Sequence, residues 1–297
     1  MLPWQSFLPP ADLTALLETA KREDLGPVGL DATGTLLIEA DRQGTADFNA
    51  RKTGVLAGAA LLPEIARAFG SGLRVEVPLT DGTPLAPGAR IARVCGPLRE
   101  ILAFERTALN LLGHLSGVAS LTALYAAQTA GTRAKIYDTR KTLPGLRGLQ
   151  KYAVSCGGGH THRMGLFDAV LVKDNHIAHL KTEELTAFLA RTAGLARERF
   201  PQLKFVMVEV DTLAQLDAVL RAPGLDLVLL DNMGLGTLAT AVAMRDKLAP
   251  QVQLEASGGV NLQTVRGIAQ TGVDRISVGA LTHSAANLDI GLDISPA

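Results

Sequence analysis

The sequence predicts an α/β protein in which an incomplete β/α barrel follows a smaller N-terminal α+β domain. After Gly131, short apolar runs that end in polar residues alternate with helical patterns, which indicates repeated βα units and a parallel sheet. These runs are continuously apolar, as burial on both faces of a sheet requires. At 297 residues, the chain is also long enough for a barrel and a second, smaller core.

The first third of the chain carries the pattern of a small α+β domain. Apolar residues recur at helical spacing after Asp12, so we expect a helix with Asp12 as its N-cap. Residues 35–97 show short strand patterns broken by turns, with one apolar helix near residues 61–69. Residues 81–88 are rich in glycine, proline, threonine and aspartate, which predicts turns.

Residues 98–130 are expected to link the two domains. Their only helix-weakening residues are Gly113 and Gly117, and this pattern predicts two helices. The predicted domains are residues 1–117 for the α+β domain, with the C-terminal tail 285–297 packed with it, and residues 118–284 for the barrel.

Repeated apolar runs supply the expected barrel strands. Six or seven βα units favour an incomplete barrel over an open doubly wound sheet, and no Gly-x-Gly-x-x-Gly opens a helix after a first strand. The expected strands are residues 135–139, 169–175, 205–211, 227–232, 252–258 and 275–280.

The composition excludes several classes of partner. Lys and Arg total 29 and Asp and Glu total 29, so no global charge favours nucleic acid or an anionic membrane. Cys95 and Cys156 lie far apart without further ligands in zinc spacing, so we expect reduced core thiols and no zinc site. With no signal-peptide pattern and no apolar run near about 18 residues, we expect a cytoplasmic protein.

Polar residues follow each expected barrel strand. In β/α barrels the loops after the strands converge on one mouth, which holds the active site. We therefore expect one pocket with several cations, at least two carboxylates and two glycine-rich turns, a set that suits a phosphorylated, metal-bound substrate. The strand-end residues are Asp138, Thr139, Arg140 and Lys141; Lys173, Asp174, Asn175 and His176; Glu209, Val210 and Asp211; Asp231 and Asn232; Ser257, Gly258 and Gly259; and Gly279 and Ala280.

The local charge also favours an anionic substrate. Residues 133–181 contain nine Lys or Arg but three Asp or Glu, within a chain of net charge zero. Plainer explanations stay open at this point: solvated loop charges, structural ion pairs at Glu209 and Asp231, and ordinary turns at the glycines. His160 and His162 form a His-x-His pair, but no third metal ligand lies near them in the sequence.

Taken in order, the motifs resemble those of quinolinate phosphoribosyltransferases, and the resemblance covers nearly the whole chain. One departure is Asp211, where the family frequently has Glu, and residues between Gly159 and His162 vary in the family, so His160 carries little weight. The matching motifs include Glu105-Arg-Thr-Ala-Leu-Asn110, Asp138-Thr-Arg-Lys-Thr142, Gly157-Gly-Gly159 with His162-Arg163, Lys173-Asp-Asn-His176, Glu209-Val210, Leu230-Asp-Asn-Met233, Glu255-Ala-Ser-Gly-Gly259 and Ser277-Val-Gly-Ala-Leu-Thr-His283.

The resemblance implies an enzyme of NAD biosynthesis. It implies that phosphoribosyl pyrophosphate and quinolinate give nicotinate mononucleotide, pyrophosphate and carbon dioxide, with Mg²⁺ as cofactor. It further implies a homodimer in which Arg106 reaches the partner's site. The implied catalytic residues are Lys141, Lys173, Glu209 and Asp231.

The implied binding residues fall into three groups. Quinolinate is expected to contact Arg106, Arg140, His162, Arg163 and Lys173. Lys141 is expected to reach the phosphates of the donor, and Glu209 and Asp231 the ribose hydroxyls and Mg²⁺, partly through water. The 5-phosphate is expected at Ser257, Gly258, Gly259 and Gly279, and Thr139, Ala280 and His283 complete the substrate-binding set.

Three other functions share part of this pattern. A phosphoribosyltransferase for another pyridine or azole acid would need fewer arginines, and competition with nicotinate would identify it. A Schiff-base enzyme would use Lys173 as nucleophile and would be trapped by borohydride with a carbonyl substrate. A non-catalytic anion-binding module would not need the pair Glu209 and Asp231.

Overall fold

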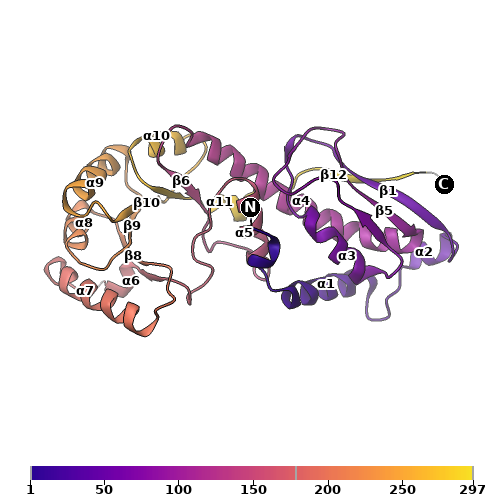
Figure 1. The fold of residues 1–297 in the computed structure, drawn as a ribbon, viewed down its shortest axis with the longest axis horizontal. Helices are drawn as coiled ribbons and strands as arrows, with labels where there is room; N and C mark the ends of the chain where they lie inside the picture. Colours follow the sequence, from indigo (N-terminus) through magenta and orange to yellow (C-terminus); the bar gives the residue numbers. More distant parts are fainter. Residues whose placement is uncertain (1, 178, 296–297) are drawn as a thin grey trace. The chain divides into compact units, whose positions relative to one another are not determined.

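The computed structural model describes residues 2–177 and 179–295, which form two compact units (Figure 1). Unit 1 contains the residues up to Ala123, Thr142–Gly158 and the residues from Ser284 onward. Unit 2 contains Leu124–Lys141 and Gly159–His283. The segment Thr142–Gly158, which we assigned from the sequence to the barrel domain, therefore clusters with the N-terminal residues.

Unit 1 is built on an antiparallel sheet of four strands in the order β12-β1-β5-β3. The last strand of the chain pairs with β1 over six residues, so the C-terminal segment completes this sheet. The strands are β1 (Gln43–Ala50), β3 (Arg74–Glu76), β5 (Arg90–Pro97) and β12 (Ile290–Ser295), with a separate pair β2 (Gly54–Val55) and β4 (Pro84–Leu85). The helices are η1 (Trp4–Ser6), α1 (Pro10–Leu25), α2 (Ala32–Leu37), η2 (Ala59–Leu61), α3 (Leu62–Phe69), most of α4 (Leu98–Gln128) and α5 (Arg147–Cys156).

Two details near the N-terminus differ from the sequence prediction. Helix α1 begins at Pro10, two residues before Asp12, because proline suits the first helical turn, where its missing N–H costs nothing. Asp12 therefore lies inside the first turn and is not the N-cap. Helix α2 occupies part of a region expected to form strands, and its N-cap Asp31 accepts a hydrogen bond from the Gly34 amide at 2.9 Å.

The linking region is one helix of 31 residues, α4, and not the two helices that the sequence predicted. Gly113 and Gly117 do not break it because they are sites of close packing. A Cβ on Gly117 would lie 2.0 Å from the Ala286 carbonyl oxygen, and one on Gly113 would lie 3.0 Å from that of Leu288. Because these two glycines have no side chains, the segment that leads to β12 can pack closely against α4.

By length and composition, α4 is the single helix among residues 2–177 and 179–295 that could cross a membrane. From the sequence, no apolar stretch of this length was expected. In the structure, 56% of its most apolar window is buried inside the protein, as in the core helix of a globular domain.

Unit 2 is an incomplete β/α barrel, as predicted. Its six parallel strands have the order β6-β11-β10-β9-β8-β7, and the barrel is not closed between β6 and β7. Helices α7, α8, α9 and α10 lie outside the curved sheet (Figure 1). The strands are β6 (Lys135–Tyr137), β7 (Val170–Val172), β8 (Val206–Val210), β9 (Leu227–Asp231), β10 (Gln253–Ser257) and β11 (Arg275–Ser277). The helices are α6 (Asp174–Ile177), α7 (Thr182–Arg199), α8 (Leu213–Leu220), α9 (Leu235–Leu248), α10 (Val265–Gln270) and α11 (Ala280–His283).

The interior of the barrel is apolar on one side. A buried cluster is formed by Ala169 and Phe205, which directly precede β7 and β8, and by Met207, Leu227 and Leu229 on β8 and β9. Because strand side chains alternate, the next inward positions along β8 and β9 are Glu209 and Asp231. The apolar cluster therefore supports the polar residues at the carboxyl ends of the same strands.

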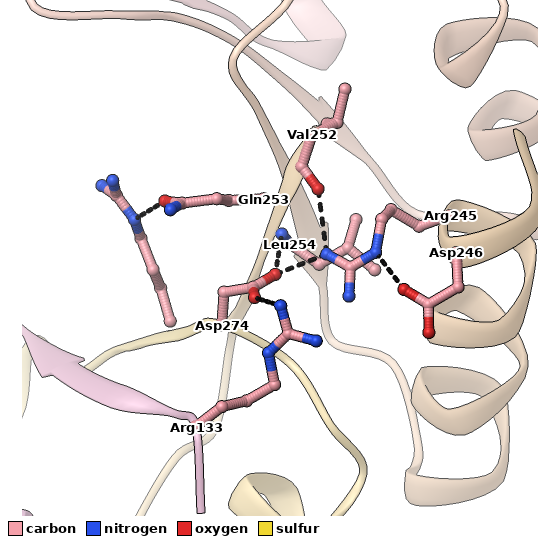
Figure 2. A network of polar contacts seen from close by, with 8 residues as sticks. Arg133, Arg245, Asp246, Val252, Gln253, Leu254 and Asp274 are labelled. Carbon is pink, nitrogen blue, oxygen red and sulfur yellow. Dashed lines mark hydrogen bonds and ion pairs between the residues drawn. The ribbon is translucent and has the colours of Figure 1, made fainter. Parts of the chain in front are cut away.

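At the amino ends of the strands, a buried arginine connects three elements (Figure 2). Arg245, at the end of α9, is 1% exposed and donates to the Val252 carbonyl at 2.9 Å and to Asp274 at 2.6 Å. Asp274 also accepts from the Leu254 amide at 2.8 Å and pairs with Arg133 at 2.5 Å. The network fixes β10 against the start of β11.

The same arrangement occurs two βα repeats earlier. Arg197 on α7 pairs with Asp226, 29 residues further along the chain, as Arg245 does with Asp274. Asp226 accepts from the Val206 amide at 2.6 Å, just as Asp274 accepts from Leu254. Strand register in the barrel is thus set at the end opposite to the strand-end polar residues.

Candidate active site

A pocket of about 770 Å³ lies at the carboxyl ends of the barrel strands, and all its lining residues belong to unit 2. It contains every residue proposed from the sequence as a site residue except Arg106. Those residues are Thr139, Arg140, Lys141, His162, Arg163, Lys173, Glu209, Asp231, Ser257, Gly258, Gly259, Gly279, Ala280 and His283. The convergence expected from barrel geometry therefore occurs for these residues and for Asn232, while the individual roles stay predictions. Six other expected strand-end residues do not line the pocket: Asp138, Asp174, Asn175, His176, Val210 and Asp211.

The cationic side of the pocket is formed by residues after β6 and by the following segment. Arg163 is 6% exposed, and its Nη1 lies 3.4 Å from the Ala169 carbonyl oxygen. Burial lowers the pKa of Arg163, and the positive charge of Arg140 lowers it further. Two guanidinium groups held this close repel each other, and an anion between them would relieve the repulsion.

The loop after Arg163 is held by Asp168. This carboxylate accepts hydrogen bonds from the Met164 and Gly165 amides at 2.8 and 2.9 Å, and Lys204 lies 3.0 Å away. Although burial opposes ionisation, the two amide donors and Lys204 hold the pKa of Asp168 below its ordinary value. The loop therefore returns to β7 in a fixed conformation, which restrains Arg163.

The acidic side of the pocket lies at the ends of β8 and β9, which are neighbours in the sheet. Glu209 accepts from the Lys173 ammonium at 2.9 Å. Asp231 accepts from the Asn232 side-chain amide at 3.1 Å. Lys173 and Glu209, which the sequence analysis assigned to different substrates, thus neutralise each other across the pocket.

Asn232 is the one non-glycine residue with positive φ in the described chain, at 53°. Its backbone N–H donates to the Ser257 carbonyl at 2.9 Å, which joins the end of β9 to the glycine-rich turn. A Cβ on Gly258, where φ is 90°, would lie 2.1 Å from the Asn232 side-chain oxygen. The turn therefore requires glycine for its backbone conformation and for the close approach of Asn232.

The second glycine turn lies after β11. A Cβ on Gly279 would be 3.0 Å from Lys141 Cδ and 3.1 Å from His283 Nε2. The Thr282 hydroxyl donates to the Lys141 carbonyl at 2.7 Å, and the Lys141 amide donates to the Thr139 hydroxyl at 3.0 Å. The absent side chain of Gly279 lets Lys141 and His283 reach the same corner of the pocket.

Several lining residues had no role assigned from the sequence, although Asn232 was among the expected strand-end residues. Asn232 and Glu255 line the pocket, together with Leu171, Leu229, Val260, Ser277 and Val278. Glu255 lies two residues before Ser257 and is the one charged residue of β10, and that isolated charge was the available signal. The hydrophobic lining residues provide a surface against which a flat ring can pack.

Three other residues do not line the pocket. Arg106 is exposed on α4 in unit 1, and Asp211 is exposed after β8. His160 stacks on the Tyr137 ring at 5.3 Å, and its pKa is lowered by burial and by the charges of Lys135 and Arg275. Among residues 2–177 and 179–295, no group of three or more His, Cys, Asp or Glu is arranged to hold a metal.

The fold is that of an incomplete β/α barrel, and the cations, carboxylates and glycine turns of its pocket suit an anionic substrate. Family models described as the N-terminal and C-terminal domains of quinolinate phosphoribosyl transferase match residues 31–116 and 118–293. The chain belongs to the quinolinate phosphoribosyltransferase family, as its motifs indicated.

Named relatives cover nearly the full chain. It is 45% identical over 282 residues to a nicotinate-nucleotide pyrophosphorylase [carboxylating] of Mycobacterium leprae, covering 94% of this chain and 95% of that one. A probable enzyme of the same name from Bacillus subtilis is 36% identical, with 95% and 93% covered. The solved nicotinate-nucleotide pyrophosphorylase of Francisella tularensis superposes with a TM-score of 0.86 at 34% identity, covering 97% and 98% of the two chains.

Proposed function

We propose that this chain transfers a phosphoribosyl group to quinolinate and removes one carboxylate, which gives nicotinate mononucleotide, pyrophosphate and carbon dioxide for NAD biosynthesis. One observation carries the proposal. A single pocket holds the buried Arg163 beside Arg140, a carboxylate on each of two adjacent strands, and two glycine turns. This arrangement matches a substrate pair with one dicarboxylate and one sugar phosphate.

The dicarboxylate fits the cationic side of the pocket. Quinolinate carries two adjacent carboxylates, and a guanidinium meets a carboxylate with two parallel hydrogen bonds. A charge pair at about 4 Å contributes roughly 4 kcal/mol at an effective dielectric of 20, so several cations together offset dehydration. Arg140, Arg163 and Lys173 supply these cations, with His162 beside them.

The phosphoribosyl donor fits the glycine turns and the carboxylates. Ser257, Gly258, Gly259 and Gly279 can present backbone N–H groups to the 5-phosphate, since no side chain blocks the approach at the glycines. Lys141, beside Gly279, lies where it can bind the donor's phosphates. His283 adds a second polar side chain at that corner.

The carboxylates fit Mg²⁺, which usually takes one or two protein carboxylates and completes its shell with water and substrate phosphate. Glu209 and Asp231 are such a pair, and they come from adjacent strands. Bound there, Mg²⁺ would neutralise charge on the departing pyrophosphate. The donor set is oxygen only, as this hard cation prefers.

The reaction has two steps. The ring nitrogen of quinolinate forms a bond to the anomeric carbon as the bond from that carbon to pyrophosphate breaks. The ring nitrogen becomes positively charged and accepts the electrons when the adjacent carboxylate leaves as carbon dioxide, and the ring carbon then takes a proton. Lys141 stabilises the pyrophosphate, while Lys173 contacts the departing carboxylate or the carbanion.

A homodimer is part of the proposal, with Arg106 of one subunit reaching the partner's site. Its exposure on α4 leaves Arg106 available to another chain. Mixing inactive Arg106→Ala and Arg163→Ala proteins should restore partial activity, because each mixed dimer keeps one intact site. No recovery of activity after verified subunit exchange would contradict the donation of Arg106 to the partner's site.

We also propose that the protein is cytoplasmic, in keeping with the burial of α4.

The direct test incubates the protein with quinolinate, phosphoribosyl pyrophosphate and Mg²⁺. Carbon dioxide and nicotinate mononucleotide should form together, and chelation of Mg²⁺ should stop both. Product without carbon dioxide would indicate transfer to a different acid. Arg140→Ala and Arg163→Ala should each lower kcat/KM by at least about a hundredfold, which is about 2.7 kcal/mol. Near-normal turnover in either folded variant would contradict the assignment of the cationic side.

A further inference from the structure

Glu255 is an anomaly in the floor of the pocket. It lies on β10, and its side chain points into the barrel with those of Gln253 and Ser257, because strand residues alternate. The residue is 0% exposed, and neither carboxylate oxygen accepts a hydrogen bond from the described residues. Burying a carboxylate without such partners opposes folding, so the position calls for a functional explanation.

The neighbouring strand shows what a purely structural residue would be. Leu229 on β9 is paired in register with Glu255 and belongs to the apolar cluster inside the barrel. An apolar side chain at position 255 would extend that cluster. Replacing buried charges by apolar residues of similar volume is often neutral or stabilising.

One polar group lies close to the Glu255 carboxylate. His162 Nε2 is 3.4 Å from Glu255 Oε1, within ion-pair range but outside hydrogen-bond geometry. The imidazole also packs its edge against the Phe205 ring, with centroids 5.2 Å apart. The ring of His162 is therefore located between the carboxylate and the apolar cluster.

The other ring nitrogen of His162 faces the cationic side of the pocket. Its Nδ1 accepts a hydrogen bond from the Arg163 backbone N–H at 2.8 Å. A ring nitrogen that accepts carries no proton, so the neutral ring has its proton on Nε2, directed at Glu255. The contacts form a continuous series from Glu255 through His162 to the main chain of Arg163.

We propose that Glu255 is a positioning residue for the acid-binding side of the pocket. It orients the Nε2–H of His162, and His162 Nδ1 in turn fixes the backbone of Arg163. The guanidinium of Arg163 is then presented to the substrate carboxylates without rearrangement on binding. This inference rests on the proposed function, because only that function makes Arg163 a substrate ligand.

The test separates positioning from structure by opposite effects on stability and binding. Glu255→Leu should leave the melting temperature unchanged or higher while it raises the KM for quinolinate about tenfold, because it removes the buried charge that orients the His162 ring. The KM for phosphoribosyl pyrophosphate should change less than about threefold, since the glycine turns are untouched. A residue that merely supported the fold would lower the melting temperature and affect both substrates.

Two further variants complete the comparison. Glu255→Gln keeps an oxygen that can accept from His162 Nε2, so it should return the KM for quinolinate to within about threefold of the unaltered enzyme. Leu254→Met is the matched control, because Leu254 is buried on the same strand but does not line the pocket. It should change stability without shifting either KM. An unchanged KM for quinolinate in Glu255→Leu, or no recovery in Glu255→Gln, would overturn the proposal.

A readout without turnover keeps this test distinct from that of the proposed function. In ¹⁵N-histidine-labelled protein, His162 should show an unprotonated Nδ1, and Glu255→Leu should mix the two ring tautomers. An unaltered His162 spectrum in Glu255→Leu would overturn the positioning role even if the enzyme is active on quinolinate. Failure of the unaltered protein to form product would instead reject the proposed function.

Discussion

The ion pair between Lys173 and Glu209 predicts that the two substrate sites are coupled. In the structure the Lys173 ammonium is bound to Glu209 at 2.9 Å. A dicarboxylate must compete with Glu209 for Lys173. When phosphoribosyl pyrophosphate and a metal bind Glu209, Lys173 becomes free to bind the dicarboxylate. Removing the Glu209 charge should therefore strengthen dicarboxylate binding in the absence of the donor.

The magnitude follows from the exposure of the two side chains. A charge pair at about 4 Å contributes about 1 kcal/mol in water and about 4 kcal/mol at an effective dielectric of 20. Since the Lys173 side chain is 45% exposed and that of Glu209 is 15% exposed, screening places the pair toward the lower figure. At about 1 to 1.5 kcal/mol, Glu209→Gln should bind a dicarboxylate about five- to tenfold more tightly.

The assay is calorimetric titration with benzene-1,2-dicarboxylate, which has both carboxylates but no ring nitrogen to react. Asp231→Asn is the matched control, because it removes a carboxylate from the neighbouring strand end that forms no ion pair among the described residues. The change in dicarboxylate affinity in Asp231→Asn measures the general gain from deleting a negative charge. The additional gain in affinity in Glu209→Gln measures the contribution of the ion pair between Lys173 and Glu209. Adding Mg²⁺ and donor should tighten binding in the unaltered protein more than in Glu209→Gln. Equal or weaker dicarboxylate binding by Glu209→Gln would refute the reasoning.

Further predictions concern the frame around the pocket. Asn232→Gly keeps the positive φ but removes the side-chain amide that donates to Asp231, so it should raise the KM for phosphoribosyl pyrophosphate about fivefold with little change in stability. Asn232→Ala should raise this KM in the same way and should also lower the free energy of urea unfolding by about 1 kcal/mol. Arg245→Met should lower the free energy of unfolding by about 3 kcal/mol, because it breaks a buried ion pair. Arg197→Met breaks the equivalent but more exposed pair and should lower it by about 1 kcal/mol or less. Equal losses in the two variants would contradict the role of burial. Because the pKa of Asp168 is lower in the folded protein than its ordinary value of 3.8, the ionised carboxylate stabilises the fold above pH 3.8. This stabilisation is lost as the pH falls through the pKa of Asp168 in the folded protein. In pH-dependent unfolding, the stability difference from Asp168→Asn should therefore shrink below pH 3.8, and a constant difference would count against it.

The barrel could be predicted from the sequence because its signal is repeated and local. Every barrel strand lies within a run that the apolar pattern marked, and Glu209 and Asp231 follow from the place where the apolar pattern stops. Where a strand ends, parallel topology places its next side chains at a common mouth. Convergence of the polar residues needed no information beyond strand direction.

Long-range contacts explain the features that were not predicted. Gly113 and Gly117 resemble helix breaks in the sequence, but each makes room for a backbone carbonyl more than 160 residues away, at Leu288 and Ala286. No local pattern encodes that contact. The segment Thr142–Gly158 likewise follows a barrel strand but clusters with unit 1.

No role was predicted for Glu255 or for Asn232, although Asn232 was expected at a strand end, and each of these residues breaks a local rule at the mouth of the barrel. A buried carboxylate without hydrogen bonds and an asparagine with positive φ both oppose folding where they stand. Such positions persist only where the surrounding structure is held firmly by other contacts. Here the buried Arg245 network fixes the amino ends of the strands, and the apolar cluster fills the middle. These contacts hold the frame of the barrel, so that the carboxyl ends of its strands can keep unfavourable groups in the geometry that binding requires.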